Sequence, residues 1–222
     1  MKKFRLFLMI ALFALVLGFS SCTGCQGGAS EEATVKDSTE VVADSTVAIN
    51  VEHAIATDRQ AMFLKFGKDY RWWETDILLP EFLDSEDATS NPVMVVNIFQ
   101  SVVEKGNGAD TWVWKYQHLA DGTVLTDSIH GFWVEDQPLN EEVIKVKFIE
   151  AYDKIMQTNA PKPHSKQVVL RNPVGPVVIN TQWIFGNIQE QLWVDAVTGD
   201  VNTSNPAFPK EKGFKMPLGE WP

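Results

Sequence analysis

The hydrophobic and polar positions of the chain divide it into three stretches with different patterns. Residues 6–19 form an apolar run without a charged residue, and this run follows a basic start that contains Lys2, Lys3 and Arg5. Residues 23–50 are rich in small, hydroxylated and acidic residues and contain no aromatic residue. From Val51 onward helical and strand-like periodicities alternate, and all eight tryptophans lie in this part. We therefore expect a folded body that begins near Val51.

The first stretch has the features of a bacterial lipoprotein signal peptide, residues 1–22. Its apolar run of about 14 residues is shorter than the ~20 that a helix needs to cross the bilayer core. The residues before Cys22 resemble a lipobox, with Phe19 where most bacteria have Leu. This pattern predicts a lipid on Cys22 and a mature protein anchored in the cell envelope, facing the periplasm or the cell exterior. Ordinary cleavage with a freely secreted product, or retention as an uncleaved anchor, are the alternatives.

Residues 23–50 are predicted to form a disordered acidic linker, because their composition cannot bury enough apolar surface to offset the chain entropy. Both cysteines, Cys22 and Cys25, precede the body, so no disulfide can cross-link it and core burial has to stabilise it. The net charge is −10 and becomes more negative when the basic signal is removed. Such a surface repels nucleic acids and anionic headgroups, which makes both poor candidate partners.

Residues 51–139 are predicted to form a helix followed by a meander of antiparallel strands. Thr57 or Asp58 is the expected N-cap, Met62, Phe63 and Phe66 fall on one face, and Gly67 is the expected end of the helix. Strand-like runs follow at residues 70–79, 93–103, 111–119 and 123–134, and the last run is either continuous or broken at Gly131. The turns between the last three are expected at residues 106–108 and 121–122, where Gly, Asn and Asp gather.

Residues 140–222 repeat the same order of a helix and then strands. Asn140 is the expected N-cap, and the acidic residues after it suit the positive end of a helix dipole. Pro161 and Pro163 end the helix, strand-like runs follow at residues 167–170, 177–185 and 191–195, and a surface tail starts at Asn205. The whole pattern predicts an α+β fold of two helix-on-antiparallel-sheet units. The apolar stripe of the helix consists of Ile144, Phe148, Ala151, Tyr152 and Ile155.

Residues 140–201 resemble the PepSY domain family. The segment that starts at Glu141 is similar to the opening amphipathic helix of that family, residues 177–185 to its middle strand, and Leu192–Val201 to its closing strand and Asp-Ala-x-Thr-Gly turn. The Pro-rich loop 172–176 and the number of tryptophans depart from the family. Residues 119–124 occupy a comparable strand-and-turn position in the first half of the chain. Whether the two halves are a tandem repeat therefore stays an open alternative. The resemblance implies a cystatin-like fold and a small module that inhibits proteases or binds other proteins, without catalytic residues.

The residues that could carry catalysis form no recognisable motif. His53, His118, His130 and His164 lack metal-ligand spacing, and the body contains no cysteine. His118 and His130 flank the hairpin at residues 121–122, so a two-His site with Asp127 is the alternative to histidines that merely pack on strands. Adjacent acids do not place two carboxylates across a cleft, and no nucleophile elbow, dinucleotide motif or P-loop occurs. We therefore predict no catalytic residue, no metal site and no cofactor.

The aromatic residues are the remaining candidates for a binding site. Trp72 and Trp73 are adjacent on a predicted strand and so point to opposite faces, whereas Trp112, Trp114 and Tyr116 share one face. These side chains either fill the core between helix and sheet or form an exposed platform for a sugar ring or a peptide.

These observations favour a cell-envelope lipoprotein that binds another envelope protein, or modulates a peptidase, through a sheet face or a strand edge. A surface glycan-binding accessory protein with exposed tryptophans is the first alternative. An enzyme on a cystatin-like or SnoaL-like scaffold is the second, and it requires His118, His130 or an acid to point into a sizeable cavity.

Overall fold

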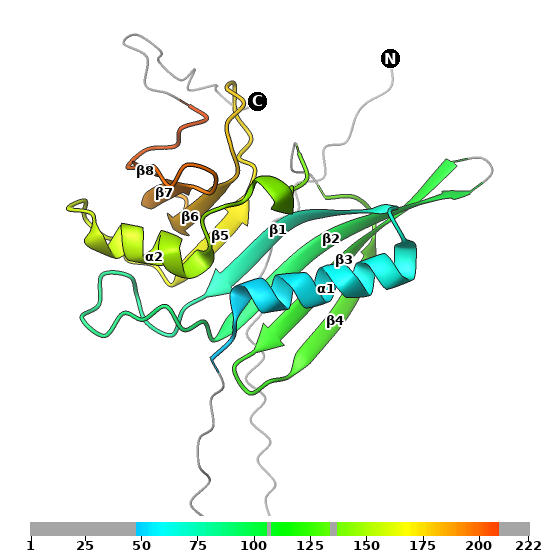
Figure 1. Cartoon of the computed structure of the whole chain (residues 1–222), viewed down its shortest axis with the longest axis horizontal. Coiled ribbons are helices and arrows are strands. Elements are labelled where there is room, and N and C mark those ends of the chain that lie inside the picture. Colours follow the sequence, from blue (N-terminus) through cyan, green and yellow to red (C-terminus); the bar gives the residue numbers. More distant parts are fainter. Residues whose placement is uncertain (1–47, 106–107, 134–136, 209–222) are drawn as a thin grey trace, which may run out of the picture. The chain divides into compact units, whose positions relative to one another are not determined.

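The computed structural model describes residues 48–105, 108–133 and 137–208, and it has the α+β class that the sequence predicts (Figure 1). Its eight strands form one antiparallel sheet in the order β4-β3-β2-β1-β5-β6-β7-β8. The elements are α1 (Val51–Phe66), β1 (Tyr70–Leu78), β2 (Met94–Lys105), β3 (Gly108–Leu119), β4 (Val124–His130), the 3-10 helix η1 (Glu141–Val143), α2 (Phe148–Gln157), β5 (Gln167–Arg171), β6 (Gln182–Gly186), β7 (Gln191–Asp195) and β8 (Val201–Asn202).

Several predicted features lie outside the described residues. They include the signal peptide with Cys22, nearly all of the linker 23–50, and residues 106–107 of the predicted turn. Within the part of the chain that the structure describes, no helix combines the length and apolar character that crossing a membrane requires.

Helix α1 begins at Val51, six residues before the first predicted cap. The Asn50 side chain accepts a hydrogen bond from the His53 backbone N–H (2.8 Å) and so caps the helix. The prediction that Asp58 caps the helix is wrong, because this residue lies on the buried face in mid-helix. Phe63, predicted on that face, is 48% exposed. Gly67 ends the helix as predicted, with a positive φ of 62° that glycine adopts without strain.

The first four strands form the predicted meander on one side of α1. Each strand pairs with the next along the chain, and Gly122 has a φ of 85° in the turn between β3 and β4. A β-bulge at Trp73 interrupts the register between β1 and β2. Strand β4 ends at His130, which agrees with the predicted break at Gly131 and not with a strand that continues to residue 134.

The second helix starts later than the sequence predicts. Asn140 does act as a cap, but for η1, where its side chain accepts from the Glu142 N–H (3.0 Å). The chain then leaves the helical conformation because the N–H groups of Lys145 and Val146 both donate to the Ala196 carbonyl, at 2.8 and 3.0 Å. Helix α2 therefore begins only at Phe148. Strand β6 also starts later than predicted, at Gln182, after a loop that contains Pro173 and Pro176.

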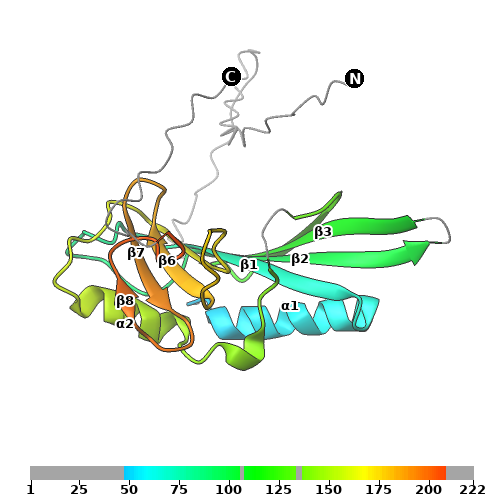
Figure 2. The same cartoon turned by 90° about the horizontal axis from the view of Figure 1, so that it is seen from above.

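Strands from both halves of the chain meet where β1 pairs with β5 over five residue pairs. Both helices lie on the same face of the sheet, α1 against β1 and β2 and α2 against β6 and β7 (Figures 1 and 2). The core between helices and sheet is continuous and rich in aromatic residues. Its largest fully buried members include Phe99, Phe148, Trp183 and Phe185.

Candidate functional site

The five predicted aromatic residues do not form one exposed platform. Trp72 and Tyr116 are buried in the core, so neither can present its ring to a sugar or a peptide. Trp114 is half-buried, and the Lys65 ammonium lies 3.5 Å from the centroid of its ring while Phe66 packs against it. The structure therefore gives most of this group the role of core packing.

Trp73 and Trp112 are partly exposed, as Trp114 is. Trp73 is the bulged residue of β1, and Trp112 lies on β3, two strands away in the sheet. The Trp112 ring packs edge-on against His130 at 5.3 Å, and its indole N–H donates to Asp110 at 3.0 Å. The glycan-binding alternative would have to rely on these two separate side chains.

Three of the four histidines pair with an aspartate, in three different places. His118 contacts Asp58 at 2.8 Å, His130 contacts Asp110 at 3.0 Å, and His164 contacts Asp84 at 3.0 Å. The predicted site that combines His118, His130 and Asp127 is not formed. His118 lies opposite Val124 and His130 opposite Trp112, so the two rings are at opposite ends of the β3–β4 ladder. Among the residues that the structure describes, no three His, Cys, Asp or Glu side chains come together to hold a metal ion.

The Asp58 carboxylate is the centre of a buried polar network that sequence reasoning missed. It accepts a hydrogen bond from the Asn97 side-chain amide at 2.6 Å and contacts the His118 ring nitrogen at 2.8 Å. The Asn97 carbonyl oxygen accepts from Thr75 at 2.6 Å, and the Thr75 hydroxyl accepts from the Trp72 indole at 3.1 Å. The network thus extends from the middle of α1 across β1, β2 and β3.

This network fixes the helix to the sheet. Burial, with the nearby Asp58 charge, raises the pKa of the Tyr116 hydroxyl, so this phenol stays neutral beside the carboxylate. A buried carboxylate with two good donors has its polar groups satisfied, which stabilises one register of α1 on the sheet. His118 also lines a hollow of about 200 Å³ together with Ile49 and Leu119. The network holds Asp58, and the hollow is also lined by His53, so the two titratable side chains in its lining are both histidines.

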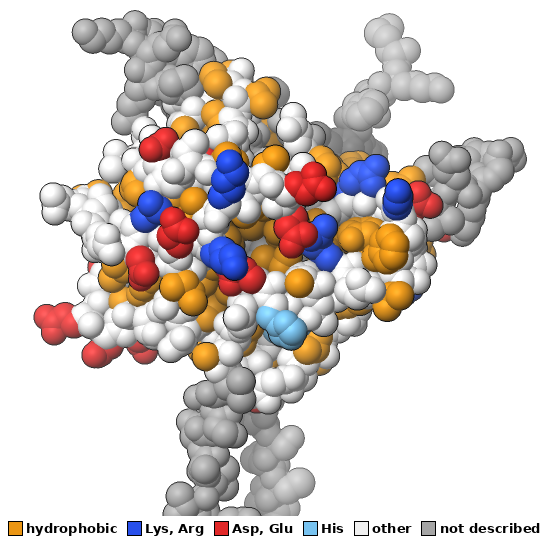
Figure 3. Space-filling model, viewed as in Figure 1, with side chains coloured by type: hydrophobic (Ala, Val, Ile, Leu, Met, Phe, Trp, Pro, Cys, Tyr) orange, Lys and Arg blue, Asp and Glu red, His pale blue; other side chains and the backbone are white. Residues whose placement is uncertain are grey.

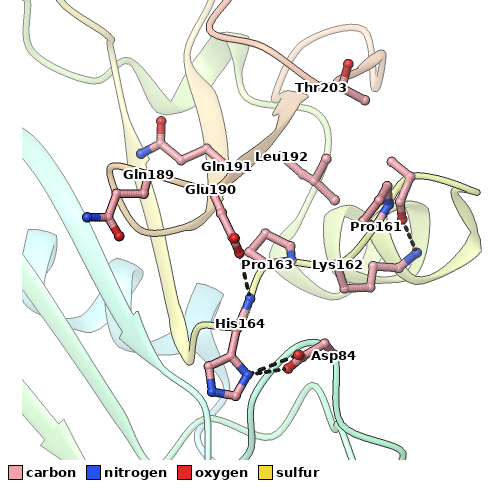
Figure 4. Close-up of a pocket in the computed structure, with 11 residues that line it drawn as sticks. Asp84, Pro161, Lys162, Pro163, His164, Gln189, Glu190, Gln191, Leu192 and Thr203 are labelled. Atoms are coloured by element: carbon pink, nitrogen blue, oxygen red, sulfur yellow. Dashed lines mark hydrogen bonds and ion pairs between the residues drawn. The ribbon is translucent and has the colours of Figure 1, made fainter.

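A cleft of about 540 Å³ lies at the end of α2, and the charged side chains that line it have hydrogen-bond partners (Figure 4). The His164 ring points to Asp84, and the His164 backbone N–H donates to the Glu190 carboxylate at 3.3 Å. The Lys162 ammonium donates to the Thr158 and Ala160 carbonyls at 2.6 and 3.1 Å. These contacts hold the loop that follows α2, and they leave few charged groups for a ligand.

Strand β4 lies at the edge of the sheet and pairs only with β3 among the described residues. Leu119 and Gly131 donate backbone hydrogen bonds to Thr123 and Thr111, and these bonds flank the β3–β4 ladder. Because hydrogen-bonded pairs alternate along an antiparallel ladder, the odd-numbered residues of β4 bond to β3. The backbone groups of Val124, Thr126, Ser128 and His130 therefore point away from the sheet.

The two edges of the sheet are protected to different degrees. Strand β8 has only two residues, whereas β4 has seven and contains no Lys, Arg or Pro. Val124, Leu125 and Ile129 of β4 are 52%, 50% and 54% exposed. The Asp127 carboxylate accepts the outward N–H of Ser128 at 2.7 Å, which is the one local protection of this edge among the described residues. Proteins usually shield such an edge with charges, prolines or a covering element.

Comparison of the chain with models of protein families, with curated proteins and with solved structures finds no match.

Proposed function

We propose that this protein is a cell-envelope lipoprotein that works by binding another envelope protein and not by catalysis. The observation that carries the proposal is the edge of β4, which no described element covers and where the Ser128 N–H alone has a local acceptor among the described residues. An extended segment of a partner can add to such an edge as a further strand, with the main-chain hydrogen bonds of the ladder supplying affinity. The predicted lipid on Cys22 would hold the body at the membrane surface, where it meets such partners.

The side chains of β4 indicate what kind of segment fits. Leu125 and Ile129 lie two positions either side of Asp127 on one face, and both are half-exposed. A partner strand with apolar residues at alternating positions would cover them and bury apolar surface on both chains. The negative charge of the whole chain favours a partner segment that is neutral or basic.

The resemblance to PepSY domains supports the same function and a finer description of the fold. In our proposal the body consists of two PepSY-like units, residues 51–139 and 140–222, each with a helix that precedes its antiparallel strands. That α1 packs on β1 and β2, and α2 on β6 and β7, supports this division. A peptidase is one class of partner that the resemblance suggests, and its inhibition would need no catalytic residue in this chain.

The test removes one outward N–H of β4 without touching the ladder to β3. Thr126→Pro deletes a donor that points away from the sheet, and proline is tolerated at edge positions of this kind. Thr126→Ala is the matched control, because it changes the side chain and keeps the N–H. We expect cross-linking in native envelopes to capture the same partner with the wild-type chain and the Ala variant, and to lose it with the Pro variant.

Two results would contradict the proposal. The first is a partner that is captured equally well by the Pro and Ala variants, both with wild-type circular dichroism. The second is repeated capture from native envelopes that recovers no partner at all.

A further inference from the structure

Asp127 lies at the middle of β4, on the face of the sheet that points away from the helices. Trp114 and His118 of β3 contact residues of α1, so Lys115, which lies at an odd position between them, points to the opposite face. Asp127 pairs with Lys115 in the ladder and therefore shares this face with it. The Asp127 side chain is exposed there.

The Asp127 carboxylate forms no ion pair with a basic side chain among the residues that the structure describes. Lys115 lies opposite it on β3, but the Lys115 ammonium is 5.7 Å from the centroid of the Trp133 ring. The carboxylate instead accepts the backbone N–H of Ser128 at 2.7 Å. On the helix face, by contrast, acidic and basic side chains lie next to one another (Figure 3). The negative charge of Asp127 is therefore available to a partner.

A strand that adds to β4 competes with Asp127 for the Ser128 N–H. This N–H is one of the outward groups of the edge, and a carbonyl of the added strand has to accept it to continue the ladder. The Asp127 carboxylate then loses its hydrogen bond while the added strand covers it. A covered charge without a partner is unfavourable, so the added strand has to supply a cation in return.

The geometry of an antiparallel ladder brings such a cation within reach of Asp127. The N–H and C=O groups of Asp127 bond to β3, so towards an added strand Asp127 occupies a non-hydrogen-bonded position. The Cβ atom of the residue opposite such a position is about 4.5–5.5 Å away, close enough for a lysine or arginine to pair with the carboxylate. Leu125 and Ile129, both half-exposed, occupy the neighbouring positions of the same face.

On the basis of the proposed function, we propose that Asp127 selects the partner of β4. The partner is an antiparallel segment with a lysine or arginine opposite Asp127 and an apolar residue two positions away on either side. A second copy of β4 does not meet this requirement. The pairing that overlaps the two whole strands is symmetric about residue 127, so it places two Asp127 carboxylates opposite each other, and like charges in that position are destabilising.

The test compares two blocked seven-residue peptides, Thr-Val-Thr-Lys-Thr-Val-Thr and its analogue with a central glutamate. The methyl NMR signals of Leu125 and Ile129 follow their binding to the whole mature chain. We expect saturable binding of the lysine peptide and about fivefold weaker binding of the glutamate peptide, because a repulsive cross-strand pair replaces a favourable one. Thr126→Pro should weaken the binding of both peptides, since it removes an outward N–H of the edge.

Matched variants separate the role of Asp127 from the overall charge of the chain. Asp127→Lys should reverse the preference between the two peptides. Asp127→Asn should remove the preference, because asparagine keeps an acceptor for the Ser128 N–H and loses the charge. Asp121→Asn removes an exposed charge from the turn before β4 and should leave the preference unchanged. Circular dichroism checks the folding of each variant.

The outcomes distinguish this proposal from the proposed function. Equal affinities of the two peptides for the folded wild-type chain, or the same effect of the Asp127→Asn and Asp121→Asn variants, would overturn the selection by Asp127 and leave binding at the edge of β4 intact. No saturable binding of either peptide would overturn both. A wild-type dimer that dissociates in the Thr126→Pro variant, measured by sedimentation velocity, would identify a second copy as the occupant and would also overturn the selection by Asp127.

Discussion

At the scale of single residues, Asp195 shows how one carboxylate organises a turn. Its Oδ1 accepts the backbone N–H groups of Val197 and Thr198 at 2.8 and 2.9 Å, and Asn180 donates to its other oxygen at 3.0 Å. Partial burial raises the pKa of Asp195, but these hydrogen bonds lower it by more, so the net pKa lies below the usual value. The ionised side chain thus stabilises the link between β7 and β8.

We expect Asp195→Asn to destabilise the protein near neutral pH and to matter much less in acid. The folded pKa is below the unfolded one, so the charge stabilises the fold above the unfolded pKa of about 3.9, and this contribution is lost as the pH falls through the folded pKa. Urea unfolding near pH 7 and near pH 3, for wild type and variant, measures the difference. A loss of stability that is the same at both pH values would show that the charge of Asp195 has no such role.

Some of this residue-level detail could be predicted from the sequence and some could not. Asp195 and Gly199 belong to the segment that resembles a PepSY turn. Asn140 is an N-cap as predicted, but it caps η1 and not the helix with the apolar stripe. Asp58 was not recognised as a core residue, because a cap and a buried aspartate look alike along the chain. Its partners Asn97 and His118 are 39 and 60 residues away, so only the fold brings them together.

At the scale of elements, the strands were predicted better than the helices. The alternation of apolar and polar residues predicts the ends of β1, β3 and β7 to within one to three residues of their observed positions. This is because the periodicity of a strand depends on neighbouring residues in the sequence. The start of α2 depends instead on the Ala196 carbonyl, which binds two N–H groups about fifty residues earlier in the chain. The sequence likewise does not predict that β4 is an edge strand, because hydrophobic patterns do not determine the order of strands in a sheet.

Glu52 shows that a side chain from one helix can cap the N-terminus of another helix. Helix α2 has no N-capping side chain of its own, and the carboxylate of Glu52, from the first turn of α1, accepts the Phe148 N–H instead. We expect Glu52→Ala to cost about 1 kcal/mol, the usual loss when a helix cap is removed, and Glu52→Gln to cost less because it keeps an acceptor. Urea unfolding measures both variants. Equal losses for Ala and Gln would indicate that the hydrogen bond does not stabilise α2.

At the scale of the whole molecule, the pairing of β1 with β5 makes the two predicted units share one sheet. Thr75 and Ile77 of β1 lie opposite Leu170 and Val168 of β5, and all four side chains are buried. Helix α1 is also connected to α2 by the Glu52–Phe148 hydrogen bond and to η1 by the Arg59–Glu141 ion pair. A tandem-repeat origin and a single folding unit are therefore compatible with each other.

This shared sheet predicts that the body unfolds in one cooperative transition. Leu170→Ala opens a cavity at the β1–β5 seam and should cost about 2–5 kcal/mol. In a single unit the stability measured by hydrogen exchange then falls equally for amides of β2 and β7, which lie in different halves. Leu64→Ala, at an exposed position of α1, is the control and should change neither. If Leu170→Ala instead destabilised β7 and left β2 at its wild-type value, the two halves would be separate folding units that merely share a strand edge.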